Sequence, residues 1–153
     1  MVVQNINITF AENINSMDRV DFCKMLISLR EKSGIGKNEM CRMAGFTFNQ
    51  LQLLENKPNN FSIDKVFVYL NTLNHVLVLD GEEYCVQIRN ISDVSKWLKK
   101  ARGVNFTQRS LATVIGCSYL TIANIERCAN KISIDIFLKI AHVLNYTVKI
   151  ENV

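Results

Sequence analysis

The chain has 153 residues, of which 48% are hydrophobic and 21% are charged, a balance that indicates a folded globular protein and excludes a disordered one. No apolar run reaches the roughly 20 residues that a membrane-spanning helix needs, and the N-terminus lacks the basic start of a signal peptide. We therefore expect a cytoplasmic protein without membrane contact. Five cysteines without C-x-x-C spacing, beside only His75 and His142, predict no metal site, and we expect no cofactor.

The formal net charge of +4 is divided unevenly along the chain. Residues 1–91 contain nine Lys and Arg against ten Asp and Glu, a charge of −1. Residues 92–153 contain nine against four, a charge of +5. A basic second half indicates a polyanionic partner for that part of the chain.

In chain order, the first half begins with residues 5–10, where polar and apolar residues alternate as they do in a strand. Helical segments follow, whose inward positions include Met40, Leu51 and Leu70. Residues 76–79 and 84–88 then flank Asp80-Gly81, a strong hairpin turn signal. We predict that the first half ends in a β-hairpin with its turn at Asp80-Gly81.

The second half reads as four short helices and a strand. Its first helix is predicted because Val94, Trp97, Leu98 and Ala101 recur at i, i+3, i+4 and i+7, which places them on one helical face. The remaining helices are predicted to begin at N-cap residues, because the hydroxyl of each can accept an orphan amide of the first turn. These N-caps are Thr107, Ser118 and Ser133, and the alternation in residues 146–150 predicts a closing strand.

The two halves repeat one another. Ser62-Ile63-Asp64 corresponds to Ser133-Ile134-Asp135 at an offset of 71, and Gly45 corresponds to Gly116 at the same offset. In the first helix the offset becomes 72, so that Arg30 corresponds to Arg102. We predict a mainly α fold with small β elements, made of two tandem four-helix units that each end in a strand or hairpin. The expected boundaries are residues 1–91 and 92–153.

Residues 106–127, with the sequence FTQRSLATVIGCSYLTIANIER, resemble the Xre family, the lambda-repressor-like helix-turn-helix. The family's pattern is an apolar residue, Ser/Thr-Gln, Leu-Ala, a turn Gly, a Ser, and then Ile-x-x-Ile/Leu-Glu. The resemblance covers most of the second half and implies double-stranded DNA as the partner, with the second helix of the pair in the major groove. Cys128 departs from the pattern, because it stands where the family ends this helix with Gly.

The resemblance also implies which residues touch DNA. Gln108 would bond phosphate at the start of one helix, Asn124 would pair with adenine, and Arg127 would hold a phosphate. Thr107 and Ser118 can equally be helix caps, and Tyr119 can be an ordinary half-buried aromatic. The full set of predicted DNA-binding residues is Thr107, Gln108, Ser118, Tyr119, Leu120, Thr121, Asn124, Arg127 and Lys131.

The first half resembles the same pattern over residues 29–57 but departs from it where DNA would be touched. Phe48 and Leu53 stand where Tyr119 and Asn124 stand, which is more typical of an interaction surface than of a base-reading one. Possible secondary DNA contacts in this half are Lys37, Asn49, Gln50, Gln52 and Lys57. The pairs Arg30–Glu55 and Arg102–Glu126 resemble a structural ion pair of the family and are assigned to the scaffold.

The leading hypothesis is a sequence-specific transcriptional regulator, repressor-like or antitoxin-like, in which the second unit dominates DNA binding. The alternative is a protein-interaction module derived from a helix-turn-helix fold, with weak or no DNA binding. An enzyme is disfavoured, because the sequence shows no Ser/His/Asp constellation, phosphate loop or metal-ligand spacing. The closing strand needs a partner in the hairpin, in residues 5–10 or in a second subunit, so a homodimer and an internal pseudo-dimer both remain open, as does a protein partner.

Overall fold

The computed structural model describes residues 17–56, 60–129 and 131–153. The strand expected at residues 5–10 therefore lies outside the described residues. The helices are α2 (Arg19–Lys32), α3 (Lys37–Ala44), α4 (Phe48–Glu55), α5 (Ile63–Thr72), α6 (Ile91–Arg102), α7 (Gln108–Ile115), α8 (Tyr119–Glu126) and α9 (Ile134–Val143). The strands are β1 (His75–Asp80), β2 (Cys85–Ile88) and β3 (Thr147–Asn152).

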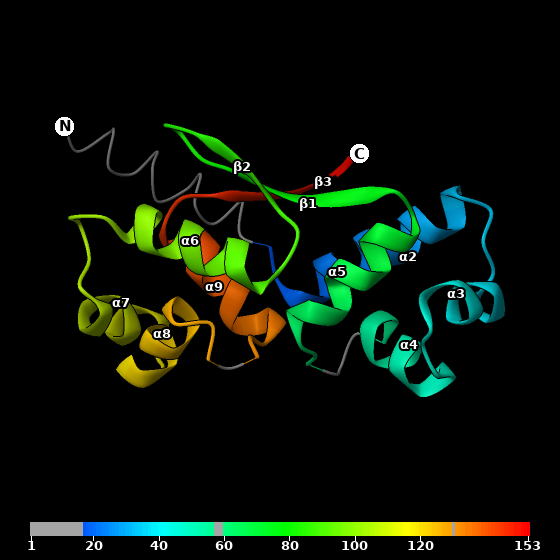
Figure 1. Ribbon diagram of the computed structural model, residues 1–153, viewed down its shortest axis with the longest axis horizontal. Helices are drawn as coiled ribbons and strands as arrows, with labels where there is room; N and C mark the ends of the chain where they lie inside the picture. The colour runs from blue at the N-terminus through cyan, green and yellow to red at the C-terminus, as the bar shows by residue number, and fades with distance from the viewer. Residues whose placement is uncertain (1–16, 57–59, 130) are drawn as a thin grey trace.

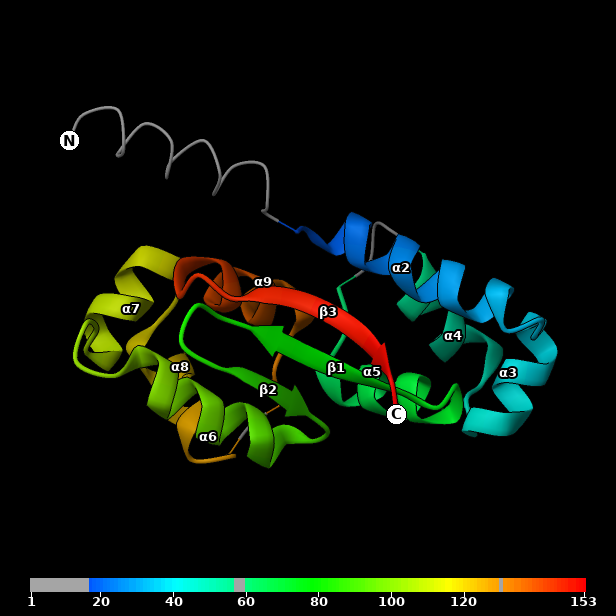
Figure 2. The same ribbon diagram turned by 90° about the horizontal axis from the view of Figure 1, so that it is seen from above.

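The helices form two groups beneath one small sheet. Figure 1 shows α2–α5 in one half of the molecule and α6–α9 in the other, with the sheet along the opposite side from α4 and α8. Seen from above in Figure 2, β1 and β3 run from one half to the other. The lengths also correspond, with helices of 14, 8, 8 and 10 residues in α2–α5 and of 12, 8, 8 and 10 in α6–α9.

The sheet joins the two halves of the chain. Its order is β2-β1-β3, and β1 pairs antiparallel with both neighbours. In the β1–β3 ladder, His75 lies opposite Asn152 and Asp80 lies opposite Thr147. The closing strand thus finds its partner in the same chain, and it runs two residues further than predicted. Strand pairing between subunits is not needed to complete it.

The predicted hairpin forms, but its turn is not at Asp80-Gly81. Asp80 still belongs to β1 and pairs with Cys85, and the Gly81 amide donates to the Tyr84 carbonyl at 3.0 Å, which leaves Glu82 and Glu83 at the tip. Gly81 does not take the positive φ that a tight Asp-Gly turn requires. It is needed instead for close approach, since a Cβ there would lie 2.4 Å from the Tyr146 ring.

The two halves share one hydrophobic core. At their junction the Ile63 amide donates to the Ile132 carbonyl, and the Ile134 amide donates to the Phe61 carbonyl, both at 2.8 Å. A chain of aromatic contacts continues this junction toward the hairpin, with ring centroids 5.3–6.1 Å apart, through Phe137, Trp97, Tyr146 and Tyr84. Residues of both halves are therefore buried against each other rather than in separate cores.

Both expected ion pairs are present, and each ties the first helix of its half to the end of the third. Arg30 donates from Nε and Nη2 to Glu55 at 2.8 and 2.9 Å, and Arg102 bonds Glu126 in the same bidentate manner at 2.9 and 2.8 Å. The carboxylate raises the pKa of each guanidinium through these hydrogen bonds. Among the described residues a third side chain joins the first pair alone, since the Tyr69 hydroxyl donates to Glu55 Oε2 at 3.0 Å.

We predict that Glu55→Gln lowers the free energy of unfolding by about 3–5 kcal/mol, because it leaves the Arg30 guanidinium buried without a countercharge. Glu126→Gln is expected to cost less, since the Arg102 side chain is 20% exposed against 6% for Arg30. Urea unfolding of the two variants measures the difference. The paired replacement Arg30→Met with Glu55→Leu should recover most of the loss, and equal costs at Glu55 and Glu126 would contradict the role given to burial.

A second prediction concerns Gly81. Gly81→Ala should destabilise the protein by about 1–3 kcal/mol, because the new methyl group overlaps the Tyr146 ring and the core must shift to admit it. Thermal or urea unfolding measures the cost. In a Tyr146→Leu background the same substitution should cost clearly less, and an unchanged cost in that background would show that the ring is not the obstacle.

Candidate nucleic-acid interface

The α7–α8 pair has the geometry of two short helices joined by a tight turn. Gly116 ends α7 with a φ of 85°, in the left-handed region that glycine enters without strain, and its amide bonds the Ala112 carbonyl at 2.9 Å. Two residues later Ser118 caps α8 by accepting from the Leu120 amide at 3.2 Å. Buried Leu111 and Ile122 hold the two helices together, which leaves the outer face of α8 open to solvent.

Thr107 is committed to capping α7. Its hydroxyl accepts from the Ser110 amide at 3.0 Å, while the Ser110 hydroxyl accepts from the Thr107 amide at 2.8 Å, a reciprocal capping box. Gln108, the first residue of the helix, is half-buried. The first-turn amides beyond the cap retain the partial positive charge that favours an anion at a helix N-terminus.

The exposed face of α8 is a mixture of aromatic, aliphatic and polar side chains. Tyr119 is 38% exposed and Leu120 is 51% exposed, while Thr121 and Asn124 are half-buried beside them. The Arg109 guanidinium lies 4.0 Å from the centre of the Tyr119 ring, a cation–π contact that positions this aromatic. Arg109 was missed by the sequence prediction, and its one sequence signal is a positive charge next to Gln108.

Asn124 and Arg127 form a hydrogen-bonded pair, in which Arg127 Nη2 donates to Asn124 Oδ1. The amide oxygen has a second lone pair, and the amide hydrogens of Asn124 have no partner among the described residues, so both groups that a bidentate contact with adenine uses remain available. The contact with Arg127 fixes the orientation of the Asn124 amide.

Four of the predicted DNA-binding residues line one groove beside α8. They are Leu120, Thr121, Asn124 and Lys131, and the other wall is made by α9 and the segment before it. Ser118 and Tyr119 lie at the start of the same helix and Arg127 lies at its end. The structure thus brings the predicted set together along α8, with Thr107 and Gln108 at the start of α7.

Cys128 takes the conformation of the glycine that it replaces. Its φ is 56°, in the left-handed region, and its amide donates to the Ile125 carbonyl at 3.1 Å. The chain therefore leaves α8 through a left-handed residue despite the substitution. Exposed Cys128 and Arg127 follow directly after the helix, and Lys131 is also exposed.

The surface around α8 is basic. Arg109, Arg127 and Lys131 are exposed, and each is without a carboxylate partner among the described residues. In the first half, by contrast, exposed Arg42 lies 3.8 Å from Glu39, which offsets its charge. The local charges agree with the +5 and −1 of the two halves, and they favour phosphate contact on the α8 side.

The corresponding α3–α4 pair in the first half has a different outer face. Phe48 and Leu53 of α4 are 48% and 45% exposed, with Asn49 exposed and Gln52 half-buried between them. Gln50 accepts from the Thr47 amide at 2.9 Å in a capping box, so its side-chain oxygen serves the scaffold. Lys37 is exposed at the start of α3, and Lys57 lies outside the described residues.

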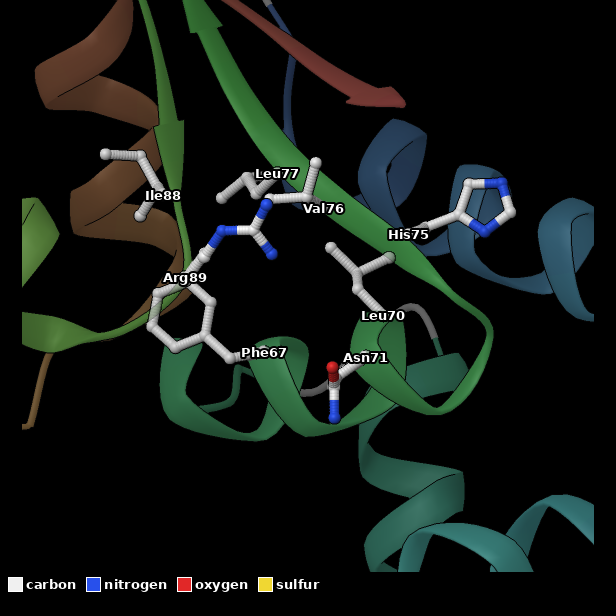
Figure 3. A pocket seen from close by; sticks show the side chains of 8 residues that line it. All are labelled: Phe67, Leu70, Asn71, His75, Val76, Leu77, Ile88 and Arg89. Carbon is white, nitrogen blue, oxygen red and sulfur yellow. The ribbon is translucent and has the colours of Figure 1, made fainter. Parts of the chain in front are cut away.

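A separate pocket of about 110 Å³ lies between α5 and the hairpin. Figure 3 shows Arg89 extending over it beside Val76 and Leu77, with Phe67 on the near wall. It contains none of the residues predicted to bind DNA. Among the described residues there is no group of three or more His, Cys, Asp and Glu that could hold a metal ion, and no helix with the length and apolar character to cross a bilayer.

Comparison with known proteins agrees with this geometry in one part of the chain. A family model described as helix-turn-helix matches residues 98–150, which extend from the last turns of α6 to β3. Searches of the curated proteins and of the solved structures give no match. Residues 98–150 are therefore similar to the helix-turn-helix family, and α7 and α8 are the two consecutive short helices inside the matched region.

Proposed function

We propose that the protein is a sequence-specific DNA-binding regulator of transcription, repressor-like or antitoxin-like, in which α8 is the main recognition helix. The observation that carries this proposal is the exposed face of α8, a helix of major-groove size, where Tyr119, Leu120 and Asn124 lie beside basic groups that have no carboxylate partner among the described residues. The helix-turn-helix match to residues 98–150 supports the same function.

We further propose that residues 1–91 and 92–153 are two tandem helix-turn-helix units, of which the first has lost part of the DNA-contact set. Equal helix order, the left-handed glycines Gly45 and Gly116, and the two bidentate Arg–Glu pairs support this interpretation. The shared sheet and core mean that these are units of a repeated sequence rather than independently folding bodies.

The second candidate function is a protein-interaction module. It is favoured by one observation, the apolar side chains of Phe48 and Leu53 that α4 exposes to solvent. DNA binding is the better-supported function because the α8 side combines a basic surface with hydrogen-bonding side chains, which a purely apolar docking face does not require.

The proposed function is tested by fluorescence anisotropy with a random-sequence duplex and with a duplex selected from a random library, each at several salt concentrations. Binding should weaken steeply as salt rises, because phosphate contacts release condensed counterions. If the protein binds neither duplex, or if its affinity for both duplexes does not change with salt, DNA binding is contradicted and the interaction module is favoured.

We predict that Arg127→Ala and Lys131→Ala weaken binding to both duplexes and each reduce the salt slope by about one unit per lost phosphate contact. Lys24→Ala is the charge-matched control, because exposed Lys24 of α2 has no carboxylate partner among the described residues and lies beside His75 and Ile150 of the sheet, on the opposite side of the molecule from α8. A control that loses as much affinity as Arg127→Ala would show that the effect reflects net charge alone.

Asn124→Ala should behave differently from the basic variants. We expect a loss of about 1–3 kcal/mol for the selected duplex, confined to one base position, with little change for random DNA. Asn49→Ala and Gln52→Ala in α4 should each cost less. If the α4 variants abolish binding while Asn124→Ala and Arg127→Ala are silent, then α4 rather than α8 is the main recognition helix.

A further inference from the structure

Two contacts between the halves join a residue to its own repeat equivalent. The offset of 71 relates Ser62 to Ser133, and these two residues form an isolated antiparallel bridge. The same offset relates Val78 to Lys149, and these two lie opposite each other near the middle of the β1–β3 ladder. A contact between a residue and its own equivalent is the mark of an isologous interface.

Two such contacts define an axis of approximate two-fold symmetry inside one chain. The axis passes between Ser62 and Ser133 and between Val78 and Lys149, so it runs from the junction of the helices to the sheet. The β1–β3 pairs on either side of Val78–Lys149 are related by the same axis. The offset of 71 converts the pair Val76–Glu151 into the pair Asp80–Thr147. The halves are therefore arranged as the two subunits of a symmetric dimer would be.

The symmetry brings both recognition helices to one face. Figure 1 places α4 and α8 in opposite halves of the molecule, on the side away from the sheet. Each is preceded by a short helix that ends at a left-handed glycine, Gly45 or Gly116. A duplex that lies along this face to contact α8 also runs past α4.

The two helices present unlike side chains at equivalent positions. Where α8 has Leu120 and Asn124, α4 has Asn49 and Leu53, so the amide and the aliphatic group have exchanged places. At the first position of each helix Tyr119 is matched by Phe48, which lacks the hydroxyl. Apolar side chains in the major groove contact the methyl group of thymine, whereas amides pair with base edges.

We infer that a single copy of this chain binds a non-palindromic operator made of two unlike half-sites, and that α4 recognises its half-site through thymine methyl groups against Leu53 and Phe48. The inference rests on the proposed function, because it assumes that α8 binds DNA. DNA is a better occupant of the α4 face than a protein, since amide side chains lie between its apolar groups and the face continues that of α8. Dimeric regulators of this type contact half-sites about 34–36 Å apart, and the same spacing is expected within this operator.

The first test measures how many chains bind one duplex and whether the selected DNA sequence is symmetric. Native mass spectrometry of the protein with a duplex selected from a random library should give one chain per duplex, and the selected sequence should lack two-fold symmetry. Two chains on a palindromic duplex would overturn the inference while leaving DNA binding by the protein intact.

The second test replaces each thymine of the selected duplex by uracil, which lacks only the methyl group. In one half-site the wild-type affinity should fall about fourfold per methyl group lost, the effect of removing one buried methylene-sized contact. Leu53→Ala should reduce that response, and the double variant Phe48→Ala with Leu53→Ala should make the affinities for the thymine and uracil duplexes equal. Asn124→Ala should lower affinity through the other half-site and leave the uracil response unchanged.

Val68→Ala is the matched control, because Val68 is 42% exposed on α5, against 45% for Leu53, and lies outside α4. This variant should keep both the wild-type affinity and the uracil response. If Leu53→Ala changes neither of them while Asn124→Ala weakens binding, the thymine-methyl assignment is wrong and the α4 face belongs to another partner. If the wild-type protein binds no DNA at all, the proposed function itself is overturned.

Discussion

The central strand β1 is hydrogen-bonded along both edges, to β2 from the same half of the chain and to β3 from the other half. Its four middle residues, Val76–Leu79, are 0–3% exposed, so both faces of the strand are covered as well. A strand in this position cannot shift by one residue without moving two ladders and reversing which side chains enter the core. The fixed register of β1 therefore sets the position of each helical group relative to the other.

Within each group the bidentate Arg–Glu pair has a comparable role over a shorter range. Arg30 and Arg102 each also donate a third hydrogen bond to a backbone carbonyl, that of Ile35 or Phe106, at 2.9–3.0 Å. The guanidinium thus links the first helix of its group, the loop that follows it and the end of the third helix. Such a fork-shaped contact constrains orientation as well as distance, and lysine could not replace it.

The sequence was most informative where local chemistry and the repeat agree. The N-caps Thr107, Ser118 and Ser133 and the turn glycine Gly116 follow from residue type and spacing, the two ion pairs follow from the repeat and the family resemblance, and the structure has all of them. These features depend on neighbours a few residues away or on the family's own geometry, which explains why a single sequence is enough to predict them.

The features that were not predicted depend on contacts between distant segments. The turn of the hairpin lies beyond Asp80-Gly81, and Gly81 instead packs closely against the ring of Tyr146, which is 65 residues away. The pair Asn124–Arg127 and the stacking of Arg109 on Tyr119 depend on the side-chain rotamers that the folded helices allow. Gln50 was expected near DNA, but its position three residues after Thr47 makes it a capping-box partner, a local alternative that the sequence also contained.

The symmetry between the halves is incomplete in a way that bears on specificity. Asp135 bonds Arg19 at 2.9 Å, whereas Oδ1 of its equivalent Asp64 is buried without a hydrogen-bond partner among the described residues, and the equivalent of Arg19 is Ile91. The Tyr69 hydroxyl that supports Glu55 likewise has Ile140 as its counterpart.

Identical subunits cannot differ in this way, because every substitution in a homodimer appears twice. Joining the two units in one chain removes that constraint, and it makes engagement of the second half-site an intramolecular step with a high effective concentration. Each recognition helix is then free to change independently while β1 and β3 keep the spacing between them, and the exchange of an amide and a leucine between α4 and α8 is the kind of divergence that this arrangement permits.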